Sequence, residues 1–456
     1  MSVEQRITYT AQAGGCLTGQ VRVPGDKSIS HRSIMLGSLS EGTMKISGFL
    51  QGEDSLATLK AFRAMGVNIT GPDKFGNVVI EGVGMHGLKA PAAPLDLGNS
   101  GTSMRLLTGL LAAQGFDLTL AGDESLSTRP MKRVTDPVIQ MGANIEPNTN
   151  GTAPLTIKSD NNTQLNGIDY TLPMASAQVK SCVLLAGLYA QGETCVTEPA
   201  PTRDHTERML QGFGYTLEVQ NIDEQRRKIC LQGGGKLIAC DIDVPSDISS
   251  TAFFIVGASI AKGSDITLQH VGINPTRIGV INILKAMGAD ITLSNEQEVG
   301  GEPVADICVR YARLKGIHIP EDQVPLAIDE FPAIAIAAAC ADGQTILTGA
   351  EELRVKESDR IQAMVDGLQI LGIDCQGTDD GMIINGGTMS SGTVDSLGDH
   401  RIAMSFAMAA LAAQGTITIK DCANVNTSFP DFIALAQKTG LNVSSSSDSS
   451  DDKASS

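Results

Sequence analysis

The sequence of 456 residues contains no tryptophan, and aromatic residues make up only 4% of it. So low an aromatic content argues against a surface that stacks nucleic-acid bases. Basic residues are also outnumbered: the formal net charge is −17, whereas a protein that neutralises nucleic-acid phosphates needs a basic face. No apolar run reaches the length needed to span a bilayer. These absences predict a protein that binds neither nucleic acid nor membrane.

Closely spaced cysteines are missing as well. The nine cysteines are scattered singly along the chain, and their spacing indicates neither a metal-ligand set nor a disulfide framework. The first twenty residues lack the basic and apolar segments of a secretory signal. We therefore expect a cytoplasmic protein with reduced thiols and no metal site.

What the sequence does contain is a sixfold internal repeat. In each copy a helical run of apolar and small residues is followed by a glycine, a short alternating strand, a polar loop and an amphipathic helix. The glycines before the six strands are Gly42, Gly115, Gly192, Gly263, Gly343 and Gly415, which gives a period of roughly 71 to 80 residues. Helices that are apolar on every side are buried ones. The pattern thus predicts an α/β protein with these helices inside and the sheets outside.

The length of the chain favours two domains over one. We expect one domain to comprise residues 1–24 plus 246–443, with an N-terminal strand and three repeats, and the other to comprise residues 25–245, with three repeats. Residues 444–456 are rich in serine and aspartate and lack apolar anchors, so they are predicted to form a disordered tail.

Polar residues gather just before the predicted buried helices. The first of these segments, residues 27–32, places Lys27 and Arg32 with two serines after a Pro-Gly-Asp turn. Helix capping explains serine, threonine, asparagine and aspartate at such places. It does not explain lysine or arginine in a first turn, where the helix dipole disfavours a cation. The pattern indicates an anionic ligand, and if both domains face their helix N-termini to one cleft, a ligand pair with several negative charges.

Five segments carry a resemblance to a known family. They are KSISHR at 27–32, LGNSGT at 97–102, RPM at 129–131, RVKESDR at 354–360 and DHR at 399–401. Together, in this order and over residues 20–432, they resemble the signature motifs of the 5-enolpyruvylshikimate-3-phosphate synthase family, in the form called class II. The resemblance implies an inside-out, two-domain enolpyruvyl transferase fold made of six βαβαββ repeats.

The resemblance also implies a reaction. Members of the family transfer the enolpyruvyl group of phosphoenolpyruvate to the 5-hydroxyl of 3-phosphoshikimate and release phosphate, through a tetrahedral intermediate. The reaction belongs to the shikimate pathway, which leads to chorismate and the aromatic amino acids. We accordingly expect a monomeric transferase that needs no metal or organic cofactor, closes its domains on the substrate and is inhibited by glyphosate.

Residue roles follow from the same resemblance. Lys27, Ser28 and Arg32 would bind the shikimate phosphate, and Lys27 would also reach phosphoenolpyruvate. The other substrate-binding residues it implies are Asn99, Gly101, Arg129, Ser176, Gln178, Arg203, Asp329, Lys356, Arg360 and Arg401. Asp329 is the expected base for the 5-hydroxyl, and Glu357 or Lys27 the expected acid at the methylene carbon.

Two positions depart from the family pattern. Thr427 stands where many relatives have lysine, and Glu352 where others have asparagine, so these two contacts are not transferred.

UDP-N-acetylglucosamine enolpyruvyl transferase is the main alternative function. That family usually has a cysteine in the loop that here spans residues 122–130, and this loop contains none. A receptor for phosphorylated ligands would share the cations but would not need Asp329 or Glu357.

Overall fold

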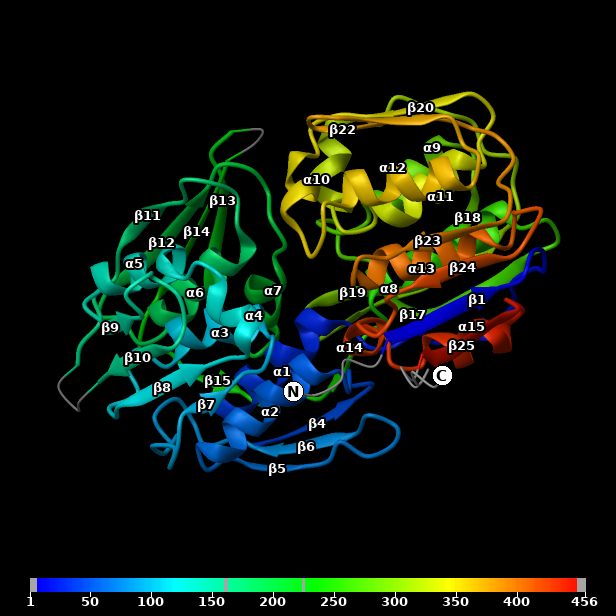
Figure 1. The fold of residues 1–456 in the computed structure, drawn as a ribbon. Coiled ribbons are helices and arrows are strands. Elements are labelled where there is room, and N and C mark those ends of the chain that lie inside the picture. The colour runs from blue at the N-terminus through cyan, green and yellow to red at the C-terminus, as the bar shows by residue number, and fades with distance from the viewer. Residues whose placement is uncertain (1–5, 160–162, 224–225, 449–456) are drawn as a thin grey trace, which may run out of the picture. The chain divides into compact units, whose positions relative to one another are not determined.

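A computed structural model describes residues 6–159, 163–223 and 226–448. The chain divides into two compact units, each with its own helices and sheets (Figure 1). Unit 1 comprises Met1–Pro24, Ser246–Gln297 and Pro303–Ser456, and unit 2 comprises Gly25–Pro245 and Glu298–Glu302.

Residues 298–302 depart from the domain boundaries expected from the sequence, because they belong to unit 2 and not to the domain of residues 246–443. They turn the chain between two strands, with Gly300 and Gly301 both at positive φ. A Cβ at Gly301 would lie 2.4 Å from the carbonyl oxygen of Arg208. Two glycines let this turn pack against unit 2 more closely than any side chain would allow.

Unit 2 contains three repeats, each with a buried helix, a more exposed helix and a sheet. The buried helices are α1 (Lys27–Leu39), α3 (Gly101–Leu110) and α6 (Ala177–Gly187), and the others are α2 (Glu53–Ala64), α4 (Glu124–Thr128), α5 (Lys132–Gln140) and α7 (His205–Gly212). The three four-stranded sheets have the orders β16-β4-β6-β5, β7-β8-β10-β9 and β11-β12-β14-β13. Their strands are β4 (Thr43–Ser47), β5 (Asn68–Thr70), β6 (Val78–Glu81), β7 (Leu95–Asp96), β8 (Leu118–Ala121), β9 (Asn144–Pro147), β10 (Leu155–Lys158), β11 (Asp169–Thr171), β12 (Glu193–Glu198), β13 (Leu217–Asn221), β14 (Arg227–Gln232) and β16 (Ile242–Asp243); a further pair joins β3 (Ser40–Glu41) and β15 (Leu237–Ile238).

Unit 1 repeats the same plan. Its buried helices are α8 (Ile248–Ile260), α11 (Phe331–Ala339) and α13 (His400–Ala409), and the others are α9 (Gly279–Ala286), α10 (Val324–Ala327), α12 (Arg360–Ile370), α14 (Val425–Ser428) and α15 (Phe432–Thr439), with 3₁₀ turns at η1 (Glu321–Gln323) and η2 (Glu351–Val355). The sheets have the orders β18-β19-β17-β2, β20-β22-β21 and β23-β24-β1-β25. Their strands are β1 (Arg6–Ala11), β2 (Thr18–Val21), β17 (Asp265–Gly272), β18 (Asp290–Val299), β19 (Glu302–Arg310), β20 (Gln344–Leu347), β21 (Cys375–Thr378), β22 (Gly381–Asn385), β23 (Gly392–Asp395), β24 (Ile417–Lys420) and β25 (Val443–Asp448).

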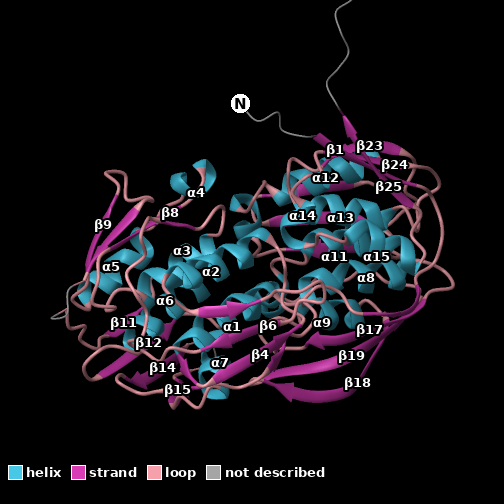
Figure 2. Ribbon diagram, turned by 90° about the horizontal axis from the view of Figure 1, so that it is seen from below, coloured by secondary structure: helices cyan, strands magenta, loops and turns pink. Residues whose placement is uncertain are grey.

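The predicted placement of helices inside and sheets outside is confirmed in each unit. Figure 2 shows α8, α11 and α13 of unit 1 with strands on the outer sides. All thirteen residues of α8 and all nine of α11 are buried. In unit 2, α3 and α6 approach so closely that a Cβ at Gly109 would lie 2.0 Å from the carbonyl oxygen of Cys182. No helix in the described parts of the chain is long and apolar enough to cross a membrane.

The prediction of a disordered tail is wrong for residues 444–448. They lie in β25, which pairs antiparallel with β1 from Val443, opposite Ala11, to Asp448, opposite Arg6. Pairing at a sheet edge uses backbone groups alone, so serine side chains do not prevent it. The rest of the predicted tail, residues 449–456, lies outside the described residues.

The expectation that all thiols are reduced is also wrong for this structure. Cys195 and Cys230, 35 residues apart in sequence, form a disulfide. They lie directly opposite each other on the antiparallel strands β12 and β14. Only the register of these strands brings the two residues together, and spacing along the chain does not reveal it.

Candidate functional site

In unit 2, the first motif forms the N-terminus of α1. The Asp26 side chain caps the helix by accepting a hydrogen bond from the Ile29 backbone nitrogen at 2.9 Å. Lys27 is the first helical residue and forms an ion pair with Asp54 at the start of α2. The cap thus fixes the start of the helix, from which the side chains of Lys27 and Ser28 project.

Arg32 lies one turn further along α1 and is buried. Its Nε donates to Thr206 Oγ1 at 2.8 Å, and its Nη2 donates to Ser181 Oγ at 3.1 Å. Its Nη1 donates to the carbonyl oxygen of Ser28 at 3.1 Å. These three partners are neutral, and burial lowers the pKa of Arg32 to about 10. The guanidinium is therefore held in place by hydrogen bonds to neutral groups, while the charges of Glu207, Asp26 and Glu302 also act on it. Its direct partners do not compete as anions, which suits an anionic ligand.

A buried group of ion pairs lies beside the hydrogen-bond partners of Arg32. Lys180 of α6 is fully buried and pairs with Glu198 at 3.0 Å and Glu207 at 2.7 Å. Although burial opposes the charged form, the two carboxylates outweigh it and raise the pKa of Lys180. Glu207 follows Thr206, a partner of Arg32, and its charge also acts on Arg32. The group thus links α6 to the hydrogen-bond partners of Arg32.

A second group of cations surrounds Gly101, the first residue of α3. A Cβ at Gly101 would lie 3.2 Å from Arg129 Nη1 and 3.3 Å from Arg105 Nη1. Arg129 Nη2 donates to Asn99 Oδ1 at 2.5 Å, and Arg105 Nη1 donates to Gln178 Oε1 at 2.6 Å. Burial, with the charges of the neighbouring arginines, lowers the pKa of Arg105 to about 10. We call Lys27, Arg32, Arg105 and Arg129 the cation cluster.

The remaining predicted residues of unit 2 lie close to this cluster. Ser176 caps α6, accepting from the Val179 backbone nitrogen at 3.4 Å. Arg203 lies in the loop before α7, and its charge acts on Arg32. His31 is buried, with Nδ1 at 2.7 Å from Thr58 Oγ1. Burial and the charges of Lys27 and Arg32 hold the pKa of His31 well below its ordinary value, so His31 is neutral at neutral pH.

In unit 1, the residues predicted from the sequence gather around one arginine. Arg360, the first residue of α12, is almost fully buried. Its Nε donates to Asp399 Oδ2 at 2.8 Å and its Nη2 to Glu357 Oε2 at 2.6 Å, while Nη1 lies 3.4 Å from Asp329 Oδ1. Burial opposes the charged form, but these three carboxylates outweigh it and raise the pKa of Arg360. We call Asp329, Glu357, Asp399 and Arg360 the carboxylate cluster.

Two further cations orient Asp329. Arg401 Nη1 donates to the backbone oxygen of Asp329 at 3.1 Å and lies 3.8 Å from Glu330 Oε1. Lys356 Nζ lies 3.7 Å from Asp329 Oδ1 and pairs with Glu352. The Asp329 side chain is thus fixed by Arg360 and Lys356 while remaining partly open to solvent, at 14% exposure.

Two acids of the carboxylate cluster, Glu357 and Asp399, are ionised at neutral pH. Desolvation opposes this, but the charge of Arg360 holds the pKa values of Glu357 and Asp399 below their ordinary range. His400, beside Asp399, behaves differently: burial, aided by the charge of Arg401, lowers the pKa of His400 to about 4. Glu357 is half exposed, so the cluster presents one fixed carboxylate, Asp329, and one accessible carboxylate, Glu357.

Two residues of these clusters, Arg105 and Asp399, were not predicted from the sequence. Asp399 lies inside the DHR segment, and Arg105 lies three residues after the LGNSGT segment. A usable signal existed for Arg105, because it is an arginine in the first turns of a buried helix. Thr427, where relatives have lysine, bonds locally instead: its Oγ1 donates to the Asn424 backbone oxygen at 2.7 Å.

Comparisons with known proteins agree on one family. The sequence profile described as EPSP synthase (3-phosphoshikimate 1-carboxyvinyltransferase) matches residues 11–435. A relative from Methylococcus capsulatus, called 3-phosphoshikimate 1-carboxyvinyltransferase, is 65% identical over 96% of this chain and 99% of its own. A relative with the same name from Hydrogenovibrio crunogenus is 63% identical over 97% of this chain and 99% of its own.

Solved structures give the same picture. EPSP synthase from Acinetobacter baumannii superimposes with a TM-score of 0.90 at 59% identity, covering 97% of this chain and all of its own. The enolpyruvyl transferase NikO from Streptomyces tendae shares the fold, with a TM-score of 0.75 at 15% identity over 97% of this chain and 99% of its own. The predicted fold class is therefore confirmed.

Proposed function

The chain belongs to the EPSP synthase family and is a transferase, and from this premise we propose how its residues divide the work of the reaction. The family reaction uses phosphoenolpyruvate and 3-phosphoshikimate. It joins the enolpyruvyl group to the 5-hydroxyl of the shikimate and releases inorganic phosphate. The cation cluster binds the phosphate and carboxylate groups, and the carboxylate cluster moves the protons.

One observation carries the assignment for unit 2. The two guanidinium groups of Arg105 and Arg129 are held beside the N-terminus of α3, both within 3.3 Å of the Cβ position at Gly101. Like charges so placed repel each other unless an anion lies with them. A phosphate matches guanidinium geometry and the free N–H groups of a helix N-terminus. We assign phosphoenolpyruvate to Gly101, Arg129 and Gln178.

The acceptor is assigned to the other part of the cation cluster. The 3-phosphate binds Lys27, Ser28 and Arg32, with Arg203 alongside. Arg32 suits this role because its fixed hydrogen bonds go to neutral groups. The shikimate ring is assigned to Ser176 and Gln178, which lie at the start of α6.

The residues of unit 1 are assigned to proton transfer. Asp329 takes the proton of the 5-hydroxyl as that oxygen attacks C2 of the enol ether. Lys27, or Glu357 after it has taken up a proton, delivers a proton to C3, which becomes a methyl group. The tetrahedral intermediate then loses phosphate together with a proton from this methyl group, which restores the carbon–carbon double bond. Lys356 holds the shikimate hydroxyls, and Arg360 and Arg401 stabilise the charge on the departing phosphate. Asn99 orients Arg129 through their hydrogen bond.

The test compares two acceptors with the same donor. Phosphate release from phosphoenolpyruvate is measured with 3-phosphoshikimate and, in parallel, with UDP-N-acetylglucosamine. We expect release with 3-phosphoshikimate only. Release with the nucleotide sugar, or with neither acceptor, contradicts the assignment. A binding protein for phosphorylated ligands gives no release with either acceptor while still binding 3-phosphoshikimate.

We also infer that the enzyme works as a monomer in the cytoplasm, where phosphorylated metabolites are retained because they do not cross membranes unaided. Size-exclusion chromatography with light scattering tests the monomer. Fractionation of the source cells tests the location.

A further inference from the structure

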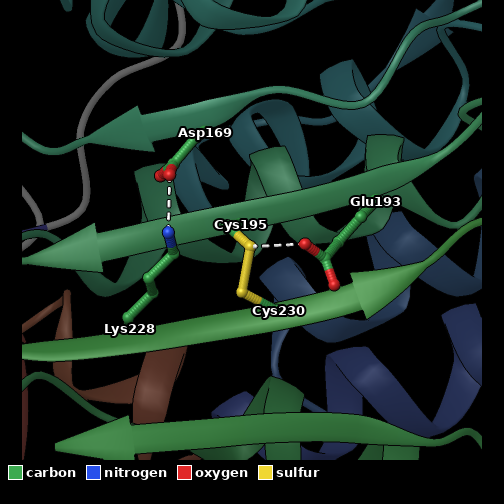
Figure 3. The surroundings of a disulfide bond; sticks show 5 residues. All are labelled: Asp169, Glu193, Cys195, Lys228 and Cys230. Carbon is green, nitrogen blue, oxygen red and sulfur yellow. Dashed lines mark hydrogen bonds and ion pairs between the residues drawn. A yellow bond between two sulfur atoms is a disulfide. The ribbon is translucent and has the colours of Figure 1, made fainter.

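The sheet β11-β12-β14-β13 of unit 2 carries a cysteine pair that the reaction does not use. Cys195 and Cys230 face each other across β12 and β14 as a disulfide (Figure 3). Glu193 is two residues before Cys195 on the same strand, so its side chain lies on the same face of the sheet. Its Oε2 is 3.5 Å from Cys195 Sγ.

This face of the sheet is the outer one. Side chains alternate along β12 and β14, and Val196 and Ile229 point to the core side. Cys195 is buried, but Glu193 is exposed and Cys230 is partly exposed, so solvent reaches the pair from the side of Cys230. A reductant can therefore attack the disulfide at Cys230 Sγ, and an ion can approach from the same side.

The charges around the sulfurs are mostly negative. Glu193 is next to Cys195, and Asp169 of β11 is in register with it. Glu218 of β13 is in register with Cys230. One cation is near, Lys228, and it forms an ion pair with Asp169 at 2.5 Å (Figure 3). Such surroundings favour a cation over an anion at this place.

We propose that reduction of this disulfide creates a binding site for a thiophilic divalent cation, for which Zn²⁺ is the probe. The ligands are the two sulfurs, Cys195 Sγ and Cys230 Sγ, and a carboxylate oxygen of Glu193. These three ligand atoms already lie within 4.8 Å of one another. Tetrahedral zinc takes thiolate at about 2.3 Å and carboxylate at about 2.0 to 2.2 Å, with water able to fill a fourth position.

The chemistry balances with an added dithiol as reductant. The dithiol gives up two electrons and two protons and becomes a cyclic disulfide. The bond between the two sulfurs breaks, and Cys195 and Cys230 become thiols. Zn²⁺ then displaces the two thiol protons as it binds. Disulfide and metal are alternative cross-links between β12 and β14, the first under oxidising and the second under reducing conditions.

The test uses the full chain, reduced with dithiothreitol and freed of it without oxygen. Co²⁺ replaces Zn²⁺ as a spectroscopic probe, because thiolate ligands give Co²⁺ a strong near-ultraviolet charge-transfer absorption. We expect one equivalent of Co²⁺ to produce this band, one equivalent of Zn²⁺ to remove it, and Zn²⁺ to raise the melting temperature of the reduced chain by several degrees. The oxidised chain should show neither effect.

Three variants make the test specific. Cys230→Ser should abolish the charge-transfer band, and Glu193→Gln should keep it while weakening Zn²⁺ affinity about tenfold. Cys308→Ser is the matched control, because Cys308 also lies on a strand near a carboxylate, Asp265, but faces Thr267 in the register. It should leave the band unchanged. The proposal is overturned if the reduced chain gives no band, if the band survives Cys230→Ser, or if Cys308→Ser removes it.

Discussion

The two units bury an arginine in the same kind of place, near a helix N-terminus, but surround it differently. Arg32 in unit 2 has hydroxyl and carbonyl partners, and burial lowers its pKa to about 10. Arg360 in unit 1 has the carboxylates of Asp329, Glu357 and Asp399, which raise its pKa. Arg32 has no carboxylate among its hydrogen-bond partners and can therefore pair with an anionic ligand. Arg360 is already paired with three carboxylates and holds them in place.

This difference underlies our proposal that the two units, which share one plan, have different tasks. A cation with neutral partners gains most when an anionic ligand arrives, so the cation cluster is suited to binding. A cation already paired with carboxylates fixes their positions and keeps Glu357 and Asp399 ionised, although it also lowers their basicity. We therefore assign the carboxylate cluster to holding and moving protons. The variants below should therefore affect binding in unit 2 and turnover in unit 1.

The largest expected effect is on turnover, from Asp329→Asn in unit 1. The amide keeps the size of the side chain but no longer accepts a proton at neutral pH. We expect kcat to fall by a factor of about 10² to 10⁴, with a much smaller change in 3-phosphoshikimate affinity. Steady-state phosphate release and calorimetric binding measure the two separately.

The control for this variant is Glu352→Gln. Glu352 is the other carboxylate partner of Lys356, and it is largely exposed. Its loss should change kcat less than threefold. A normal rate for Asp329→Asn, or an equal loss in the control, would contradict the assignment of Asp329 as the base. It would also contradict the proposed division of tasks between the two clusters.

The next largest effect is on stability, from Lys180→Met in unit 2. The change leaves Glu198 and Glu207 buried without their cation. Breaking a buried ion pair in this way costs about 3 to 5 kcal/mol. The chain has no tryptophan, so urea unfolding is best followed by circular dichroism.

A second variant separates charge from packing at this position. Lys180→Met combined with Glu207→Gln removes one of the two uncompensated carboxylates, and we expect it to recover part of the lost stability. If the double variant is no more stable than Lys180→Met alone, the loss comes from packing. Lys180 then does not stabilise the fold by neutralising Glu198 and Glu207.

How much of this could be read from the sequence depends on the distance that each feature spans. The repeat glycines and the cations near helix starts are local signals, and they predicted buried helices with sheets outside and an anionic ligand. Most residues of the two clusters were predicted from the resemblance to the family, which five short motifs carry. Lys180 and Glu207 are 27 residues apart and meet only because α6 and α7 pack together. The disulfide similarly needs the register of β12 and β14. The strand of residues 443–448 was missed because it pairs with the far end of the chain.

The next effect in size is a loss of stability in acid, which we expect from His400. The pKa of His400 is about 4 in the folded protein, against about 6.5 in an unfolded chain. Between these values the unfolded chain binds more protons, so stability rises with pH and is lost as the pH falls from 6.5 to 4. The loss amounts to about 2 kcal/mol after allowance for the partial exposure of His400.

Urea unfolding at several pH values measures this loss. His400→Gln does not titrate, so its stability should depend less on pH over the same window. His318→Gln is the matched control, since His318 is an exposed histidine of the same unit, and its profile should follow that of the unchanged chain. Identical profiles for all three proteins would show that His400 is not held neutral beside the carboxylate cluster.

The smallest effect, and the most specific to the cation cluster, is expected from Gly101→Ala. The added methyl group would lie 3.2 Å from Arg129 Nη1 and 3.3 Å from Arg105 Nη1, so both guanidinium groups must shift by a few tenths of an ångström. We expect inhibition by glyphosate to weaken about tenfold, which corresponds to about 1.4 kcal/mol, and the KM for phosphoenolpyruvate to rise less. Gly387→Ala in unit 1 is the control, because its Cβ meets only Ile373, at an ordinary 3.5 Å. Equal inhibition of all three proteins would mean that the anion does not lie against Gly101, and the assignment of phosphoenolpyruvate to Arg129 would fall with it.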